Sequence, residues 1–366
     1  MTKINHSENN NISWWRTSFG EEVLQSVTEA IRRECVSLGP ITQEFENRLA
    51  KELGVPYVVA TTSGSTAILM ALMALDIKKG DEVIVPNRTW IATAHAPMML
   101  GAKVILVDVL PDIPIMDVSQ IRKKLSSRTK AIIPVPLNGR AVNMQEVWNI
   151  AKEYGLHVVE DAAQGLFSKC SEKYMGTESD VGCFSMSIAK LVPMGQRGFV
   201  VTKNKKTYEQ LKRVRMHGVD DVIDCTFHQM GFNFRPTDIQ ASIGLVQLDR
   251  VQKRIQQHKN VYLRYKDGIK DLSFLKLIPV DIANDEIPIY VEVLCKKREH
   301  LVNFLASQNI QSRPFYPCLN TAKYLNTLGT FPNAEVFGNQ GLFLPCGPEQ
   351  PLESIDRVIE ALRLFK

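Results

Sequence analysis

A turn rich in Gly, Ser and Thr is the first stretch of this 366-residue sequence whose residue types could do chemistry. The stretch Thr61-Thr-Ser-Gly-Ser-Thr-Ala67 lies between a short expected strand and an apolar helical pattern. Gly64 would let the backbone approach a ligand closely, and the helix N-terminus would offer unpaired N–H groups. With the hydroxyls of Ser65 and Thr66, the turn could bind a phosphate monoester. The same residue types serve as plain helix caps, so the turn alone does not identify a site.

An aspartate at the end of an expected strand is the next candidate. Asp161 follows the apolar run at residues 156–159, in the stretch Glu160-Asp-Ala-Ala-Gln164. The carboxyl ends of strands in an open α/β sheet face the crevice where such sheets bind ligands. A carboxylate buried there needs a partner, and a protonated pyridine nitrogen would be one. Taken in isolation, Asp161 could equally be a helix cap.

A lysine in an apolar stretch completes the set. Lys190 has Ile188-Ala189 before it and Leu191-Val-Pro193 after it. Apolar surroundings disfavour the charged form of a lysine, and a neutral amine can form a Schiff base with an aldehyde. A surface lysine near a loop is the alternative. The order of phosphate-binding turn, strand-terminal aspartate and then a lysine 29 positions later (190 − 161) resembles the layout of fold-type I enzymes that use pyridoxal 5′-phosphate (PLP).

Alternating strands and helices would position these residues. Amphipathic helical patterns occur at residues 66–75, 116–124, 144–154 and 206–216. This alternation indicates βαβ units in a mostly parallel sheet, and near-continuous apolar strands are typical of a sheet covered on both faces. The sequence therefore predicts an α/β fold. The apolar, β-branched runs expected to form its strands lie at residues 83–85, 104–107, 131–135, 156–159, 181–184 and 199–202.

The two ends of the chain have a different pattern. Residues 1–13 form a polar stretch, and we expect the Trp14-Trp15 pair after it to dock the arm by simple packing. After Pro236 a long helical pattern runs toward residue 265, and the remainder mixes strand and helix patterns. We therefore expect an N-terminal arm at 1–20, a large domain at 21–245 and a small α+β domain at 246–366. Further expected elements are helices at 21–34, 41–53, 298–308 and 352–364 and a strand at 288–294.

Composition narrows the class of protein. Hydrophobic residues make up 45% and charged residues 23%, which is ordinary for a globular protein. The net charge of +5 is mild and scattered, so we expect no nucleic-acid partner. The seven cysteines are odd in number and widely spaced, which favours free thiols and no metal site. Without an apolar run long enough for a membrane span or a signal peptide, we expect no membrane contact and a cytoplasmic location.

Five ordered stretches resemble the DegT/DnrJ/EryC1/StrS family of sugar aminotransferases, from about Gly39 to the C-terminus. The resemblance implies a fold-type I PLP transferase, with a mostly parallel, seven-stranded-type sheet in the large domain and a smaller C-terminal α+β domain. The stretches are Thr62-Ser-Gly-Ser-Thr-Ala, Val85-Pro-Asn-Arg-Thr-Trp-Ile-Ala-Thr, Val159-Glu-Asp-Ala-Ala-Gln, Gly182-Cys-Phe-Ser and Gly231-Phe-Asn-Phe-Arg-Pro-Thr-Asp-Ile-Gln-Ala.

The resemblance also implies roles for individual residues. Lys190 would hold PLP as a Schiff base and then move the proton, and Asp161 would pair with the pyridinium nitrogen. Trp90 would stack on the ring face. The other implied cofactor contacts are Gln164 at the phenolic oxygen, Ser185 with Gly64 and Ser65 at the phosphate, and Asn233 at the phosphate bound by the neighbouring subunit of a homodimer.

Candidate substrate residues lie where the sequence departs from the family pattern. Asn138-Gly-Arg140 stands where a Tyr-Gly-Gln type of sequence is common, and Asn320 stands where a histidine is frequent. Arg140, Arg197 and Arg313 could bind a phosphate or a sugar carboxylate, or each could be a structural ion-pair residue. Tyr316 lies in the same late segment as Arg313, and Arg235 is a candidate for the carboxylate of the amino donor.

The expected activity is transfer of an amino group from L-glutamate to a keto sugar, with PLP passing through pyridoxamine 5′-phosphate during turnover. We expect the sugar to be nucleotide-linked, although a keto sugar acid without a nucleotide stays open. One alternative is the dehydratase branch of the same fold, which carries histidine in place of the Schiff-base lysine, so Lys190 argues against it. A non-catalytic PLP-binding regulator is the other alternative, and it would be expected to lose Asp161 or Lys190.

Overall fold

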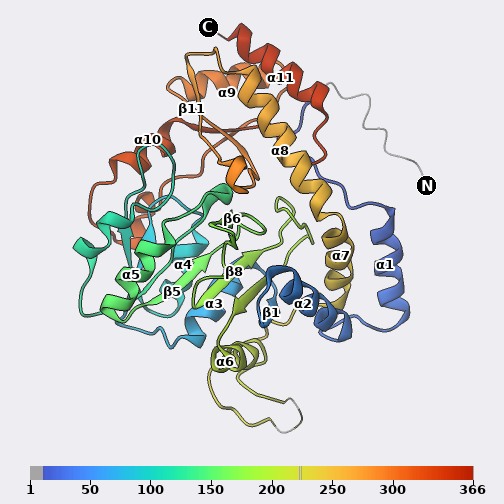
Figure 1. Cartoon of the computed structure of the whole chain (residues 1–366), viewed down its shortest axis with the longest axis vertical. Helices are drawn as coiled ribbons and strands as arrows, with labels where there is room; N and C mark the ends of the chain where they lie inside the picture. The colour runs from blue at the N-terminus through green and yellow to red at the C-terminus, as the bar shows by residue number, and fades with distance from the viewer. Residues whose placement is uncertain (1–10, 222, 224, 366) are drawn as a thin grey trace.

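A seven-stranded sheet forms the centre of the protein (Figure 1). The computed structural model describes residues 11–221, 223 and 225–365. The sheet has the order β1-β9-β8-β5-β4-β2-β3, and only β9 runs antiparallel to its neighbours. This confirms the expected α/β class with a mostly parallel sheet. Its strands are β1 (Tyr57–Thr61), β2 (Glu82–Pro86), β3 (Lys103–Val107), β4 (Thr129–Ile132), β5 (His157–Asp161), β8 (Val181–Ser185) and β9 (Gly198–Thr202).

Helices cover the large sheet, and the burial of its strands follows from this. All residues of β2 and β9 are buried, as expected for strands that are covered on both faces. Helix α3 packs across β8, β9 and β5, whereas α5 packs against β5 and β4. The helices of this part are α1 (Glu21–Arg32), α2 (Pro40–Leu53), α3 (Gly64–Ala74), α4 (Ala92–Met99), α5 (Met144–Tyr154), α6 (Lys205–Arg215) and α7 (Asp238–Asp249).

A smaller antiparallel sheet with the order β10-β11-β13-β12 forms the C-terminal part of the chain. Short strands β6 (Lys169–Cys170) and β7 (Lys173–Tyr174) form a separate hairpin. Within the described residues, no helix has both the length and the apolar character needed to cross a bilayer. The remaining elements are β10 (Leu275–Leu277), β11 (Val291–Cys295), β12 (Arg313–Pro314), β13 (Gly341–Leu344), α8 (Val251–Gly268), α9 (Arg298–Ser307), α10 (Pro332–Gln340) and α11 (Leu352–Leu364).

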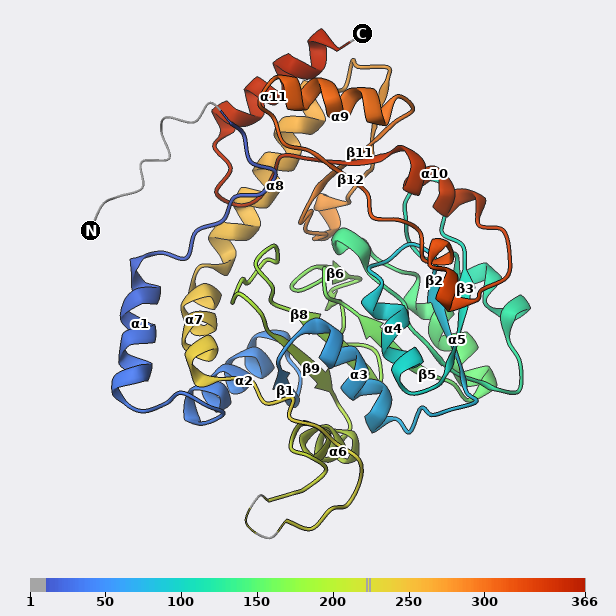
Figure 2. The ribbon, with the colours of Figure 1, turned by 180° about the vertical axis from the view of Figure 1, so that it is seen from behind.

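The long helix expected after Pro236 is two helices, because the helical geometry breaks at Arg250. Helix α7 packs beside α1 and α2, and α8 continues toward α11, as both Figure 1 and Figure 2 show. The two halves therefore pack on different partners. The division into an arm, a large domain and a small domain with a boundary near residue 245 stays a prediction.

The helix expected at residues 116–124 does not form as an α-helix. The segment contains two short 3-10 turns, at Val118–Gln120 and Arg122–Lys124. The side chain of Asp117 accepts a hydrogen bond from the Ser119 backbone N–H at 3.2 Å, and such local bonds compete with α-helical pairing. Met116 also pairs with Val109 in an isolated β-bridge, which holds the start of the segment in an extended form.

The N-terminal segment packs along the small sheet. Ile12 forms a β-bridge with Ile310, and Trp15 forms one with Cys346. Ile12 is buried, and Trp14 packs against the hydrophobic core. The segment therefore docks as expected from its tryptophans, while most of the polar stretch at residues 1–13 lies outside the described residues.

Candidate active site

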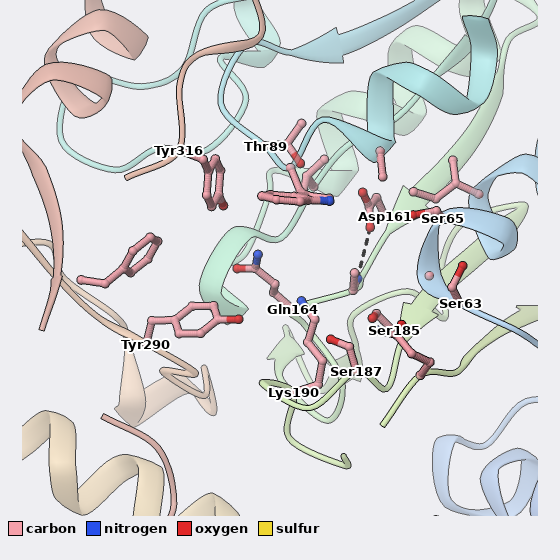
Figure 3. Close-up of a pocket in the computed structure, with 18 of the residues that line it drawn as sticks. Ser63, Ser65, Thr89, Asp161, Gln164, Ser185, Ser187, Lys190, Tyr290 and Tyr316 are labelled. Atoms are coloured by element: carbon pink, nitrogen blue, oxygen red, sulfur yellow. Dashed lines mark hydrogen bonds between the residues drawn. The ribbon is translucent and has the colours of Figure 1, made fainter. Parts of the chain in front are cut away.

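A cavity of about 450 Å³ opens at the carboxyl ends of β5 and β8, between the large sheet and the small one. Figure 3 shows side chains from both parts of the chain facing it. This is the crevice in which open α/β sheets bind their ligands. The cavity is lined by Trp14, Ser63, Gly64, Ser65, Ile68, Thr89, Trp90, Ala92, Val135, Asp161, Ala163, Gln164, Ser185, Ser187, Lys190, Gln196, Tyr290, Arg313, Pro314, Tyr316 and Phe343.

The turn before α3 forms one end of the cavity. The Ser63 hydroxyl accepts the Thr66 backbone N–H at 3.1 Å, and the Thr66 hydroxyl accepts the Ser63 N–H at 2.9 Å, which is a capping box. Thr66 is therefore used by the helix cap and does not line the cavity, whereas Gly64 and Ser65 do. A Cβ atom on Gly64 would lie 2.7 Å from the Cβ of Ser185. Only glycine fits at position 64, because the turn there lies so close to Ser185. We call this turn at the start of α3 the phosphate cradle, since the free N–H groups of the turn suit a phosphate.

Asp161 lies at the end of β5 and is buried. Its carboxylate accepts a hydrogen bond from the Thr93 hydroxyl at 2.6 Å and one from the Ala163 backbone N–H at 3.3 Å. Burial raises the pKa of Asp161, while the two hydrogen bonds and the charge of Lys190 act in the opposite direction. A cationic partner in the cavity would offset the desolvation of this carboxylate.

Lys190 lies in the turn after β8 and faces the same cavity (Figure 3). Desolvation lowers the pKa of Lys190 to about 8, although the charge of Asp161 acts to raise it. A substantial fraction of this amine is therefore neutral in mildly alkaline solution. Such an amine can attack an aldehyde, which an ordinary surface lysine does poorly.

Trp90 and Gln164 line the cavity between its two ends. The Trp90 side chain is 56% exposed, and its ring meets the ring of Tyr316 edge-on at 5.4 Å. The Gln164 carbonyl oxygen accepts the backbone N–H of Asn138 at 2.8 Å. The cavity therefore has an aromatic surface and an amide close to Asp161 and Lys190.

The groups in the cavity fit PLP. The cradle at the start of α3 suits the phosphate, the buried carboxylate of Asp161 suits the ring nitrogen, and the weakly basic amine of Lys190 suits the aldehyde. The sequence places these groups at separate points along the chain, and the fold brings them into one cavity.

The wall contributed by the small sheet is aromatic and carries one cation. Arg313 and Tyr316, which the sequence analysis gives as candidate substrate residues, lie in this wall, and their substrate role stays a prediction. Trp14 lies there too, although the sequence suggested only a packing role, and its ring lies 4.0 Å below the guanidinium of Arg313. Sequence reasoning missed Tyr290 and Phe343, since a lone aromatic residue in a strand pattern gives no signal beyond core packing.

Other predicted site residues lie outside the cavity lining. Arg140 is fully buried in an ion pair with Glu292, so its geometry matches the structural alternative considered for it. Asn320 exchanges hydrogen bonds with Asn87, at 2.8 and 3.0 Å. Asn233 and Arg235 lie in the segment that joins α6 to α7, where the Asn233 side-chain oxygen accepts the Arg235 Nε–H at 2.8 Å.

Comparison with known proteins agrees with this geometry. A GDP-perosamine synthase from Escherichia coli O157:H7 is 34% identical over 331 residues, covering 90% of this chain and 91% of that protein. The solved structure of S. venezuelae DesV in complex with a ketimine intermediate is 28% identical, with a TM-score of 0.90 over 97% of this chain and 98% of that one. The E. coli GDP-4-keto-6-deoxy-D-mannose-3-dehydratase with bound hydrated PLP is 25% identical, with a TM-score of 0.88 over 96% and 99% of the two chains.

These likenesses confirm the expected fold-type I architecture and the use of PLP. The model of the DegT/DnrJ/EryC1/StrS aminotransferase family matches residues 17–363, which is nearly the whole chain. The chain belongs to the DegT/DnrJ/EryC1/StrS aminotransferase family, and it is a PLP-dependent sugar aminotransferase of deoxyamino-sugar biosynthesis.

Proposed function

We propose that this enzyme takes the amino group of L-glutamate and delivers it to a keto sugar that is carried on a nucleotide. The observation that carries the proposal is one cavity that is lined both by the phosphate cradle, Asp161 and Lys190 and by Arg313. The name of the GDP-perosamine synthase links that relative to a GDP-carried sugar, which supports a nucleotide-linked acceptor here.

Six of the residues that line the cavity have a role in this part of the proposal. PLP supplies an aldehyde and an electron-accepting ring. Lys190 holds the cofactor through its Nζ and later carries the proton that moves during transfer, which its lowered pKa permits. Asp161 keeps a proton on the ring nitrogen by charge pairing, and Trp90 covers the ring face. Gly64, Ser65 and Ser185 bind the phosphate.

Arg313 is the residue that favours an anionic substrate. Among the described residues, Lys190 and Arg313 are the only cationic side chains that line the cavity. No ion pair between described residues includes Arg313. Its guanidinium lies over the ring of Trp14, at 4.0 Å from the ring centroid. A planar guanidinium held in this way suits a diphosphate, so we assign Arg313 and Trp14 to the nucleotide end of the acceptor.

The segment between α6 and α7 supports a homodimer with shared active sites. It projects from the rest of the molecule in Figure 1 and exposes the apolar side chains of Phe227, Met230 and Phe232. Apolar side chains gathered on a projecting segment favour a protein contact. In this proposal the segment packs on a second copy, and its Asn233 reaches the phosphate cradle of that copy.

The cysteines support a reducing compartment. Cys183, Cys295 and Cys318 are buried as free thiols. Free buried thiols are usual in proteins of the cytoplasm, and we propose that location.

An absorbance titration tests the proposed half-reaction with the donor. Purified protein with PLP should show a visible band that the Lys190→Ala variant lacks, and L-glutamate should convert that band to the spectrum of the amine form of the cofactor. A nucleotide-linked keto sugar should then restore the original band. A band that L-glutamate leaves unchanged would refute the choice of donor. Release of a deoxy keto sugar without an amino product would instead favour the dehydratase alternative.

Subunit mixing tests the shared active site. Lys190→Ala and Asn233→Ala each damage one half of a shared site, so a hybrid dimer contains one intact site. Random mixing of the two inactive variants should therefore restore about one quarter of the wild-type activity. No recovery after mixing, with hybrid dimers shown to form, would contradict a contribution of Asn233 to the partner's site.

A further inference from the structure

A tight turn after β4 connects the cavity to the small sheet. Asn138 and Gly139 both have left-handed backbone conformations, with φ of 57° and 73°. A Cβ atom on Gly139 would lie 2.3 Å from the Ile287 carbonyl oxygen. The turn therefore presses directly against the segment that leads into β11, and asparagine is one of the few residue types that adopt this backbone conformation readily.

Asn138 is fully buried, and its side-chain amide forms hydrogen bonds through both its nitrogen and its oxygen. Its side-chain amide donates to the Tyr290 carbonyl oxygen and to the Glu292 carboxylate, both at 3.0 Å. Its side-chain oxygen accepts the Tyr290 backbone N–H at 2.7 Å. Its own backbone N–H donates to the side-chain oxygen of Gln164 at 2.8 Å. One residue thus joins the small sheet to the amide that lines the cavity.

A buried ion pair holds the far side of this junction. The Arg140 guanidinium lies 2.5 Å from the same Glu292 oxygen that Asn138 contacts, and both charged side chains are almost completely buried. Arg140 also donates to the carbonyl oxygens of Pro279 and Ile278. Such a pair is costly to break, because loss of one partner leaves the other charge buried and unpaired. Arg140 therefore holds Glu292, and Glu292 holds the Asn138 side chain.

The direction of the hydrogen bond to Gln164 sets the orientation of its amide. A backbone N–H can only donate, so the Gln164 oxygen must face Asn138. The Gln164 NH₂ group is then directed away from Asn138. Burial raises the pKa of the Tyr316 hydroxyl, whereas the Gln164 side chain acts to lower it. Figure 3 shows Gln164 between Tyr316 and Lys190 in the cavity.

We propose that Asn138 is a positioning residue, which fixes Gln164 with its NH₂ group toward the cofactor, and that the Arg140–Glu292 pair holds Asn138 in place. The proposal rests on the proposed PLP-dependent function and on the role that the family resemblance implies for Gln164, as a contact of the cofactor's phenolic oxygen. It gives Arg140 a function at a distance from the cavity, through the chain of contacts Arg140, Glu292, Asn138 and Gln164.

The first test compares the absorbance of PLP-loaded variants as a function of pH. An N–H donor stabilises a negatively charged oxygen. Loss of the Gln164 amide should therefore raise the midpoint of the titration, which is the pH at which half of the visible band is lost, by about one pH unit. Asn138→Gly keeps the left-handed turn but removes the side-chain bonds, and it should shift the midpoint in the same direction. In a Gln164→Ala background, Asn138→Gly should add no further shift, because it acts through Gln164.

Glu286→Gln is the matched control. Glu286 is a buried carboxylate at the same junction, and it accepts the Ala141 backbone N–H at 2.7 Å, but no contact with Gln164 is involved. This variant should retain the wild-type midpoint. An unchanged midpoint in Asn138→Gly would overturn the proposal, and so would a shift of equal size in the Gln164→Ala background. If Asn138→Gly does not fold, Asn138→Asp keeps the shape and the acceptor for Tyr290 while it replaces the donor, and the same outcomes apply.

A second readout does not depend on the cofactor. In protein labelled with ¹⁵N-glutamine, the side-chain resonance of Gln164 is identified by its loss in Gln164→Ala. Asn138→Gly should move this resonance in the PLP-free protein, whereas Glu286→Gln should leave it in place. An unmoved resonance in Asn138→Gly would overturn the proposal. If wild-type protein shows no Lys190-dependent band, the proposed function fails, and this measurement alone decides whether Asn138 positions Gln164.

Discussion

Replacement of Thr93 by valine should weaken PLP binding in a pH-dependent way. The Thr93 hydroxyl donates to the Asp161 carboxylate at 2.6 Å, inside a site where burial already raises the pKa of Asp161. A hydrogen bond to a charged group contributes about 1.5–3 kcal/mol. Its loss should raise the pKa of Asp161 by about one to two further units, since one unit corresponds to about 1.4 kcal/mol.

The sign of the effect follows from the protonation of Asp161. A protonated carboxyl cannot pair with the cationic ring nitrogen, so affinity falls as the pH drops through the pKa of Asp161. The pH below which PLP affinity falls should therefore lie about one unit or more higher in Thr93→Val than in the wild type. The assay is a PLP titration by visible absorbance at a series of pH values from mildly acidic to mildly alkaline.

The control replaces another threonine whose hydroxyl does not contact Asp161. Thr177 is buried and donates to the Tyr174 carbonyl oxygen at 2.7 Å, so Thr177→Val has the same chemical change elsewhere. Its PLP affinity should follow the wild-type pH profile. Identical pH profiles for Thr93→Val and wild type would refute the reasoning that the hydroxyl keeps Asp161 ionised.

Further predictions concern the lysine, the substrate wall and the assembly. The rate of PLP incorporation should rise with pH, with a midpoint near the lowered pKa of about 8 for Lys190. Stopped-flow absorbance measures this rate, and a midpoint near the ordinary value of 10.5 would contradict the lowered pKa. Arg313→Gln should raise the KM for a nucleotide-linked acceptor about tenfold or more, and should affect the donor half-reaction less, as separate single-turnover measurements would reveal. Phe232→Asp should dissociate the dimer, which light scattering after gel filtration detects; an unchanged mass would argue against the projecting segment as the interface.

The reactive end of the cavity was readable from local sequence. Gly64 lies at the start of a helix, Asp161 at the end of β5 and Lys190 in the turn after β8, and these positions follow from short apolar patterns. Because the carboxyl ends of parallel strands meet at one edge of a sheet, an α/β prediction is sufficient to place such residues together. Their residue types then limit the chemistry, since a phosphate cradle, a carboxylate and a weakly basic amine suit few cofactors.

The arrangement of the substrate-side residues, and of the residues that hold Gln164 in place, depends on contacts between segments that are distant in the sequence. Trp14 and Arg313 are 299 positions apart (313 − 14), yet their side chains stack, because the N-terminal segment docks on the small sheet. Arg140 looked like a possible anion site, but Glu292 neutralises it from another sheet. Whether a charged side chain faces a ligand or a buried partner is set by packing, which residue spacing does not encode. The orientation of Gln164 likewise required the turn at Asn138, because hydrogen-bond direction is a property of three-dimensional geometry.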